Sequence, residues 1–300
     1  MRRPFRLPLL LLPLLAVAPA RADEVDDAVA EAHALLKEGK ADEARARLEP
    51  VAAAHPESAP VQYALAQAAV LKKDFPRARK HCERTVELNP ALLDARLVLA
   101  ELYRAEKKPK EARKQLEEVL KRDPGNASAL QAQGDVDRDL KRYPEAAGWY
   151  ERALEKKPGS PKVLGLIATA WAEAAQAAAQ AGNRKKRDEH GGKAIDAYRK
   201  CLEAYPEGVE MLYNLGTVAL FCERFDEAGD ALEKFLEQRP EEARAVHNLA
   251  QVREKQGRDE EALELFRRFL GMAEKDKALR TEVAYARGRI KDLEKKLKKK

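Results

Sequence analysis

The sequence of 300 residues predicts an all-α fold of stacked helix pairs. One observation is a recurring alanine, and a second is a proline that follows it at a constant distance. The prolines are Pro56, Pro90, Pro124, Pro158, Pro206 and Pro240, at successive intervals of 34, 34, 34, 48 and 34 residues. The third observation is that each interval holds two amphipathic stretches of about three helical turns. Such units stack because one helix pair cannot bury its apolar face alone.

The segment 59–92 shows the residue pattern of one unit. Apolar residues spaced by three and four, among them Ala64, Leu65 and Ala68, predict a first helix over 60–72. Pro76 suits the first turn of a second helix over 76–89, and Pro90 ends that helix. Small residues recur where the two helices must approach closely, namely Ala66, Ala100, Gly134, Ala168, Gly216 and Ala250. The pattern therefore predicts a tight helical hairpin in every unit.

The period and these small residues resemble those of tetratricopeptide repeat proteins, and residues 209–242 (VEMLYNLGTVALFCERFDEAGDALEKFLEQRPEE) match the pattern best. The resemblance implies a right-handed superhelical solenoid whose first helices line an inner groove. The predicted units are 25–58, 59–92, 93–126, 127–160, 161–208 with an insertion, 209–242 and 243–276. Residues 277–300 follow as a capping helix with a basic tail, because Leu279, Val283, Ala286, Ile290, Leu293 and Leu297 recur at three or four.

Residues 1–22 have the features of a secretory signal peptide. Arg2, Arg3 and Arg6 precede an apolar core over 7–17, and the sequence 20–22 (Ala-Arg-Ala) offers a cleavage site. The core is too short to span a membrane, which needs about 20 residues. We therefore expect cleavage near Ala22 and an exported, periplasmic protein.

The charge of the chain resides at its two ends. The formal net charge is +6, but residues 1–22 carry four arginines and the tail 291–300 carries six lysines against two acids. The body between them is close to −2, without the basic stripe of a nucleic-acid-binding domain. We therefore predict no nucleic acid as a partner, and weak contact of the tail with an anionic membrane surface stays open.

The fifth unit carries 14 extra residues. Its alanine-rich part predicts a first helix that continues to about Ala181, where Gly182 and Asn183 end it. The following segment is predicted as a charged loop, closed by Gly191 and Gly192. Its basic residues are Arg184, Lys185, Lys186 and Arg187. The loop is either merely solvated or a basic finger that contacts an acidic partner or an anionic surface.

The residues that usually carry chemistry show no constellation. The three cysteines are predicted to be free thiols, with Cys82 and Cys201 buried, because Cys201 and Cys222 lie too far apart along antiparallel helices to be bridged. The five histidines are scattered without metal-ligand spacing, and no nucleophile or phosphate-binding motif occurs. We predict no enzyme, with no catalytic residue, metal or cofactor.

The resemblance implies instead that peptides or partner helices bind along the inner groove. By position, the groove candidates are Tyr63, Gln67, Val70, Leu71, Leu97, Glu101, Arg104, Gln131, Asp135, Arg138, Tyr213, Thr217, Leu220, Phe221, His247 and Gln251. Two apolar pairs, Val70–Leu71 and Leu220–Phe221, stand among mixed polar residues. Exposed apolar area rimmed by polar groups is typical of interaction sites, although these side chains can equally be covered by the neighbouring unit.

The sequence thus favours a non-catalytic scaffold or adaptor in the bacterial cell envelope, holding one or more proteins or peptides in an assembly, secretion or motility complex. The alternative is a protein that binds polyanions or a membrane surface through residues 184–187 and the lysine tail. Salt separates the two, because charge-driven binding falls steeply with ionic strength while binding through apolar anchors persists.

Overall fold

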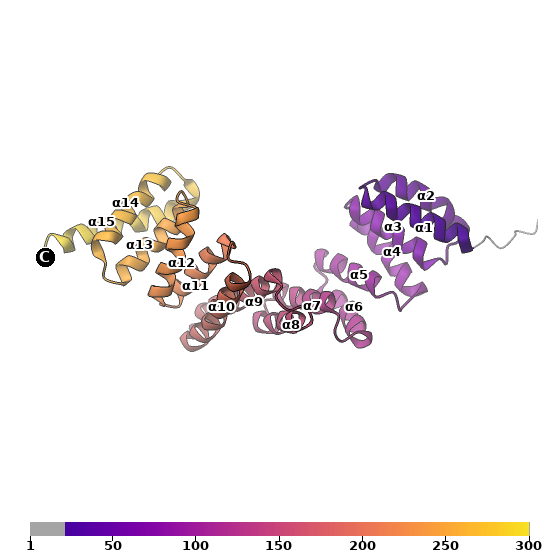
Figure 1. The fold of residues 1–300 in the computed structure, drawn as a ribbon, viewed down its shortest axis with the longest axis horizontal. Helices are drawn as coiled ribbons and strands as arrows, with labels where there is room; N and C mark the ends of the chain where they lie inside the picture. The colour runs from indigo at the N-terminus through magenta and orange to yellow at the C-terminus, as the bar shows by residue number, and fades with distance from the viewer. Residues whose placement is uncertain (1–21, 300) are drawn as a thin grey trace, which may run out of the picture. The chain divides into compact units, whose positions relative to one another are not determined.

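A computed structural model describes residues 22–299 of the chain. That part contains fifteen α helices, one short 3-10 helix and no strand, which confirms the all-α fold (Figure 1). The chain divides into two compact units, residues 1–102 and 103–300, and the division falls within one helix. The signal-peptide prediction lies outside the described residues, except for its last position, Ala22. None of the described helices is long and apolar enough to cross a membrane.

The first unit holds two helix pairs and most of a fifth helix. Its helices are α1 (Ala22–Lys37), α2 (Ala41–Ala54), α3 (Ala59–Leu71), α4 (Phe75–Leu88) and α5 (Leu93–Ala105), of which the last crosses the division. Each of α2, α3 and α4 packs on the helix before it, and α1 also contacts α3.

The second unit continues the alternation. Its helices are α6 (Pro109–Arg122), α7 (Ala127–Asp139), α8 (Tyr143–Lys156), α9 (Pro161–Gln180), α10 (Arg184–Ala204), α11 (Val209–Phe221), α12 (Phe225–Gln238), α13 (Ala243–Lys255), α14 (Asp259–Ala273), η1 (Lys277–Leu279) and α15 (Arg280–Leu297). From α6 to α15 each α helix packs against the next. We call the first helix of a pair the A helix and the second the B helix.

The turn inside each ordinary pair has one conformation. Lys73, Lys107, Lys141 and Glu223 adopt left-handed φ values of 58° to 62°, and Gly39 and Gly257 occupy the same place in their units. The left-handed residue closes the A helix, because the next N–H can then reach back to a carbonyl in the last helical turn. In the second pair that bond runs from the Asp74 N–H to the Ala69 oxygen at 2.9 Å.

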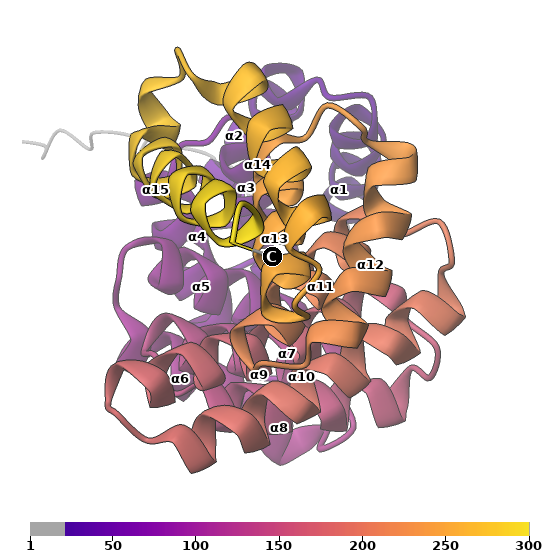
Figure 2. The same cartoon turned by 90° about the vertical axis from the view of Figure 1, so that its left-hand side faces the viewer.

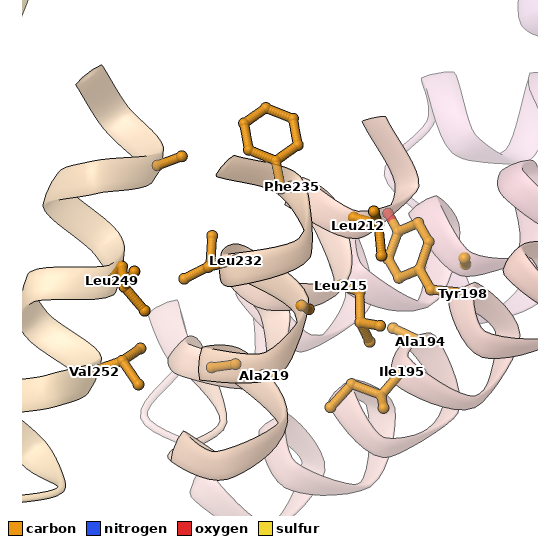
Figure 3. Packing of buried hydrophobic residues seen from close by; sticks show 14 of the residues in the cluster. Ala194, Ile195, Tyr198, Leu212, Leu215, Ala219, Leu232, Phe235, Leu249 and Val252 are labelled. Atoms are coloured by element: carbon orange, nitrogen blue, oxygen red, sulfur yellow. The ribbon is translucent and has the colours of Figure 1, made fainter. Parts of the chain in front are cut away.

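In the second unit the core is a layer between the A and B helices, and the first unit has a separate cluster of buried residues. Figure 3 shows part of this layer, with Ile195 of α10, Leu215 and Ala219 of α11, Leu232 of α12 and Leu249 of α13 in one buried cluster. Glycine at the small-residue position of an A helix lets the B helix approach. A Cβ added at Gly216 would lie 2.6 Å from Leu232 Cγ, which confirms the predicted close approach there.

The insertion lengthens both helices of its pair. Helix α9 has 20 residues and α10 has 21, against 13 in α11 and 14 in α12, so each is longer by seven. Helix α9 ends at Gln180, and Gly182 has φ +72°, which confirms the predicted stop. The predicted charged loop is wrong: residues 184–190 form the first turns of α10, and the Asn183 side chain caps it by accepting the Lys186 N–H at 3.0 Å.

The glycines predicted to close that loop lie inside α10. Gly191 is buried, and a Cβ there would collide with Cys222 Sγ, whereas Gly192 has nothing within 4 Å. Cys222 is 9% exposed, so all three free thiols are buried rather than the expected two. The extra turns of α10 cover the end of α11, where an ordinary unit would leave this cysteine more open.

The C-terminal segment packs on the last pair as α15 (Figure 2). Its residues Val283, Ala286 and Leu293 are buried, and Ile290 and Leu297 are half-buried, as their spacing predicts. Ion pairs fix the packing at its polar edge: Lys296 Nζ lies 2.8 Å from the buried carboxylate of Asp259.

Candidate functional site: two hollows on the A helices

The A helices carry a repeated ion-pair position. Three pairs join residues 35 apart, each linking the twelfth residue of one unit to the thirteenth of the next. Arg104 donates to Asp139 at 3.1 Å, and Arg138 donates to Glu173 at 2.9 Å. Arg289 of α15 donates to Glu254 in the same register at 2.9 Å. At these places the charged side chains on this face of the A helices are paired with each other within the chain.

The apolar residues occupy this same position elsewhere. Leu36, Val70 and Leu220 stand where Arg104 and Arg138 stand in their own units, so no ion pair forms there. Val70 is 37% exposed, and its neighbour Leu71 is 45% exposed. Phe221, next to Leu220, is 40% exposed. The two apolar pairs that the sequence singles out therefore stand where other units form ion pairs, and both lie at a hollow.

The first hollow lies in the first unit and has a volume of about 520 Å³. Three consecutive A helices line it: α1, α3 and α5 contribute His33, Leu36, Lys37, Gln67, Val70, Leu71 and Val98. Most of its wall is aliphatic, so it suits an apolar side chain of a partner. Tyr63 lies on α3, as Val70 and Leu71 do, and is half-buried. Burial, together with the negative charge of Asp94, raises the pKa of its hydroxyl to about 12.

The second hollow lies in the second unit and has a volume of about 530 Å³. It is formed by α11, the turn that follows, the first residue of α12, and α13, through Thr217, Leu220, Phe221, Glu223, Phe225, Asn248, Gln251 and Lys255. Its wall combines two aromatic rings with amides and both signs of charge. A partner here can be held by apolar contact and by directional hydrogen bonds.

The extended hairpin borders this second hollow. The guanidinium of Arg187 in α10 lies 6.0 Å from the centre of the Phe221 ring. Arg184 and Arg187 also pair with Glu223, at 2.9 and 3.3 Å. Lys185 and Lys186 are exposed. Two of the four predicted basic residues thus pair with Glu223, a residue of the α11–α12 turn that lines the hollow, so they lie next to the hollow rather than on a separate loop.

Several predicted groove residues make contacts within the chain. The hydroxyl of the buried Tyr150 donates to Asp135 at 2.6 Å, and burial raises the pKa of that hydroxyl. Arg104 and Arg138 are half-buried in their ion pairs, and Leu97 and Gln131 are half-buried as well. Glu101 is exposed, whereas Tyr213 is half-buried and its ring lies 5.2 Å from that of Phe235.

His247 lies beneath the capping helix. It is 6% exposed, with ring centres 4.8 Å from Phe269 and 5.7 Å from Tyr285 of α15. Gln251 contacts its ring at 3.0 Å. Burial lowers the pKa of His247 below the usual value, because a charged imidazole would lose its hydration. Its ring therefore offers no accessible surface for a partner.

Side chains of metal-ligating types, and thiols, are present among the described residues. Among residues 22–299 no three His, Cys, Asp or Glu side chains lie close enough to hold a metal ion. Burial raises the pKa of the Cys82 thiol to about 12, and the thiol pKa values of Cys201 and Cys222 are raised by the same cause. Such thiols are poor nucleophiles, since the thiolate is the reactive form.

Some lining residues were missed by the sequence prediction. His33, Leu36 and Lys37 lie 34 residues before Gln67, Val70 and Leu71, so the repeat period alone could have found them. Lys255 likewise lies 34 residues after Phe221. Val98 had no such signal, because the residues chosen in its unit were Leu97, Glu101 and Arg104.

The stacked helix pairs define a helical-repeat protein. Two family models described as tetratricopeptide repeat match residues 29–92, 97–161 and 208–275, which together are 197 of the 300 residues. The chain belongs to the tetratricopeptide repeat family. The matched ranges stop at 161 and resume at 208, on either side of the lengthened pair. This family is generally a non-enzymatic protein-interaction fold.

Solved structures show the same fold at low identity. The chain is similar to a tetratricopeptide repeat protein from Parabacteroides merdae ATCC 43184, at 13% identity and TM-score 0.55 over 88% of this chain and 99% of that one. It is similar to YrrB, a TPR protein with an unusual peptide-binding site, at 18% identity and TM-score 0.54 over 67% of this chain and 96% of that one. The MamA protein matches at 17% identity and TM-score 0.52 over 63% of this chain and 96% of that one. None of the curated proteins compared with the chain matches it.

Proposed function

We propose that this chain is a non-catalytic scaffold that binds a peptide or a partner helix at the two hollows on its A helices. One observation carries the proposal: the apolar pairs Val70–Leu71 and Leu220–Phe221 each line a hollow of about 520 to 530 Å³, and all but the half-buried Leu220 are exposed. Ion pairs occupy the corresponding surface elsewhere. YrrB, a protein of the same fold with an unusual peptide-binding site, supports this use of stacked helix pairs.

The test is selection of peptides from a random displayed library on the chain without residues 1–22. Replacing Leu220 and Phe221 by aspartate is expected to lower the affinity for peptides selected at the second hollow by about a hundredfold, because each buried apolar anchor typically contributes more than 1 kcal/mol. Val70→Asp with Leu71→Asp should do the same at the first hollow. Fluorescence anisotropy of labelled peptides measures both effects.

Each double variant is the matched control of the other, since both add two carboxylates at residues that are already partly exposed. Circular dichroism should show unchanged helix content in each. Selected peptides that bind both variants as tightly as the unaltered chain would contradict the proposal.

We also propose that the protein is exported and acts in the cell envelope, in an assembly, secretion or motility complex. The basic start, apolar core and Ala-Arg-Ala sequence of residues 1–22 support export. In a bacterial host, amino-terminal sequencing of the periplasmic fraction should give a chain that begins at Asp23. Ala20→Glu with Ala22→Glu should block this processing. An intact chain in the cytoplasm without either change would refute export.

A further inference from the structure

The second hollow is surrounded by more positive than negative charge. Five cations lie on its rim and on the adjoining start of α10, and two acids lie among them. The cations are Arg184, Lys185, Lys186, Arg187 and Lys255, and the acids are Asp188 and Glu223. Of the neighbouring acids, Glu189 pairs with Lys193 at 3.1 Å and Glu227 with Arg199 at 2.8 Å, while Asp226 accepts a hydrogen bond from Gln256 at 2.8 Å.

The single acid that lines the hollow is already neutralised. Glu223 receives Arg184 at 2.9 Å and Arg187 at 3.3 Å, and Arg187 also reaches Asp188 at 2.7 Å. Lys255, on the α13 side, makes no ion pair within residues 22–299. The field in the hollow is therefore positive, and it is open to solvent because the Arg184 side chain is 71% exposed.

We propose that the lengthened helix pair makes the second hollow selective for acidic peptides that carry an apolar or aromatic anchor. Leu220, Phe221 and Phe225 would receive the anchor. Acidic side chains flanking it would meet Arg184 on one side and Lys255 on the other. Opposite potentials across an interface speed association and exclude partners of the wrong charge. This inference rests on the proposed function and specifies the partner of one of its two sites.

The position of Arg187 connects the charge to the anchor. Its guanidinium is 6.0 Å from the centre of the Phe221 ring and is held by two carboxylates. The arginine thus brings a cation close to an aromatic ring that lines the hollow. Both contacts exist because α10 begins two turns earlier than an ordinary B helix.

The experiment uses two labelled hexapeptides. One has leucine and phenylalanine at its centre with two glutamates on each side, and the other has lysines in place of the glutamates. We expect the acidic peptide to bind at least about tenfold more tightly to the chain without residues 1–22. Its affinity should fall as NaCl rises from about 50 to about 300 mM. Equal affinity of the two peptides would overturn the inference.

Variants place the effect on this hollow. Arg184→Gln with Lys255→Gln is expected to lower the affinity for the acidic peptide by about tenfold. Lys157→Gln with Lys200→Gln removes two exposed charges that do not line this hollow and should change the affinity by less than about twofold. An equal loss in both pairs would mean that only the net charge of the molecule matters, which also overturns the inference.

Failure of the inference can be told from failure of the proposed function. If both hexapeptides bind equally and Phe221→Asp abolishes both, the hollow binds peptides without selecting acids. If neither peptide binds, or if binding persists in Phe221→Asp, the peptide-binding role of the hollow is wrong as well.

Discussion

Replacing Asp137 by alanine is expected to lower the free energy of unfolding by about 3 kcal/mol. Asp137 lies in α7, is 4% exposed, and accepts hydrogen bonds from Arg113 of α6 and from the indole N–H of Trp149 at 2.9 Å. Arg142 approaches the same carboxylate at 3.8 Å. Alanine would leave the guanidinium of Arg113 and the indole N–H without this acceptor, and a group that loses its partner keeps its desolvation cost. Urea unfolding followed by circular dichroism measures the loss.

The matched control is Asp139→Ala, two residues along the same helix. That carboxylate is 52% exposed in its pair with Arg104, so its removal should cost less than about 1 kcal/mol. Asp137→Asn should lie between the two, because it keeps an acceptor for Trp149 but loses the charge. Equal losses for Asp137→Ala and Asp139→Ala would show that the buried carboxylate contributes no more than a surface pair.

Gly134→Ala is expected to cost about 2 kcal/mol of folding free energy, although alanine is the better helix former. A Cβ at this position would lie 2.5, 2.7 and 2.9 Å from three carbons of the Tyr150 ring. The ring is fully buried, and its hydroxyl is held by Asp135, so it cannot turn aside cheaply. The helices α7 and α8 would have to separate.

Gly148→Ala in α8 is the control, because nothing lies within 4 Å of a Cβ there. That variant should gain up to about 1 kcal/mol from helix propensity. Thermal unfolding should therefore move in opposite directions for the two glycines. A rise in melting temperature for both would show that α7 and α8 are not packed as closely as described.

The helix pairs were predictable from sequence because the signal is repeated. The proline interval, the small residue at Gly134 and Gly216, and the apolar spacing of three and four all point to the same hairpin in unit after unit. The start of α10 was not predictable in this way. Two adjacent glycines and a run of charges usually indicate a loop, but Gly191 is required by its contact with Cys222, and Arg187 is held by Glu223. Both partners are more than 30 residues away in sequence.

The candidate site was predictable only in part, for the same physical reason. Repeat position identified the A-helix face, and the apolar pairs at Val70 and Leu220 stood out on it. The sequence could not say which polar residues of that face pair with each other. Arg138 looks as available as Gln67 until Glu173 is placed beside it, at 2.9 Å. The extra residues of the fifth unit likewise reveal their role only when Arg187 is found beside Phe221.

The equal lengthening of α9 and α10 has a geometric consequence. Seven residues rotate an α helix by about 700°, only about 20° short of two whole revolutions, so the apolar stripe continues almost in phase. Because both helices of the hairpin grow by the same seven residues, their ends stay level and the connecting turn needs no adjustment. An addition of five residues to each would swing the stripe by about 140° and face it to water. A repeat of this kind can therefore be elongated in paired heptads, and new surface is acquired without disturbing the units that follow.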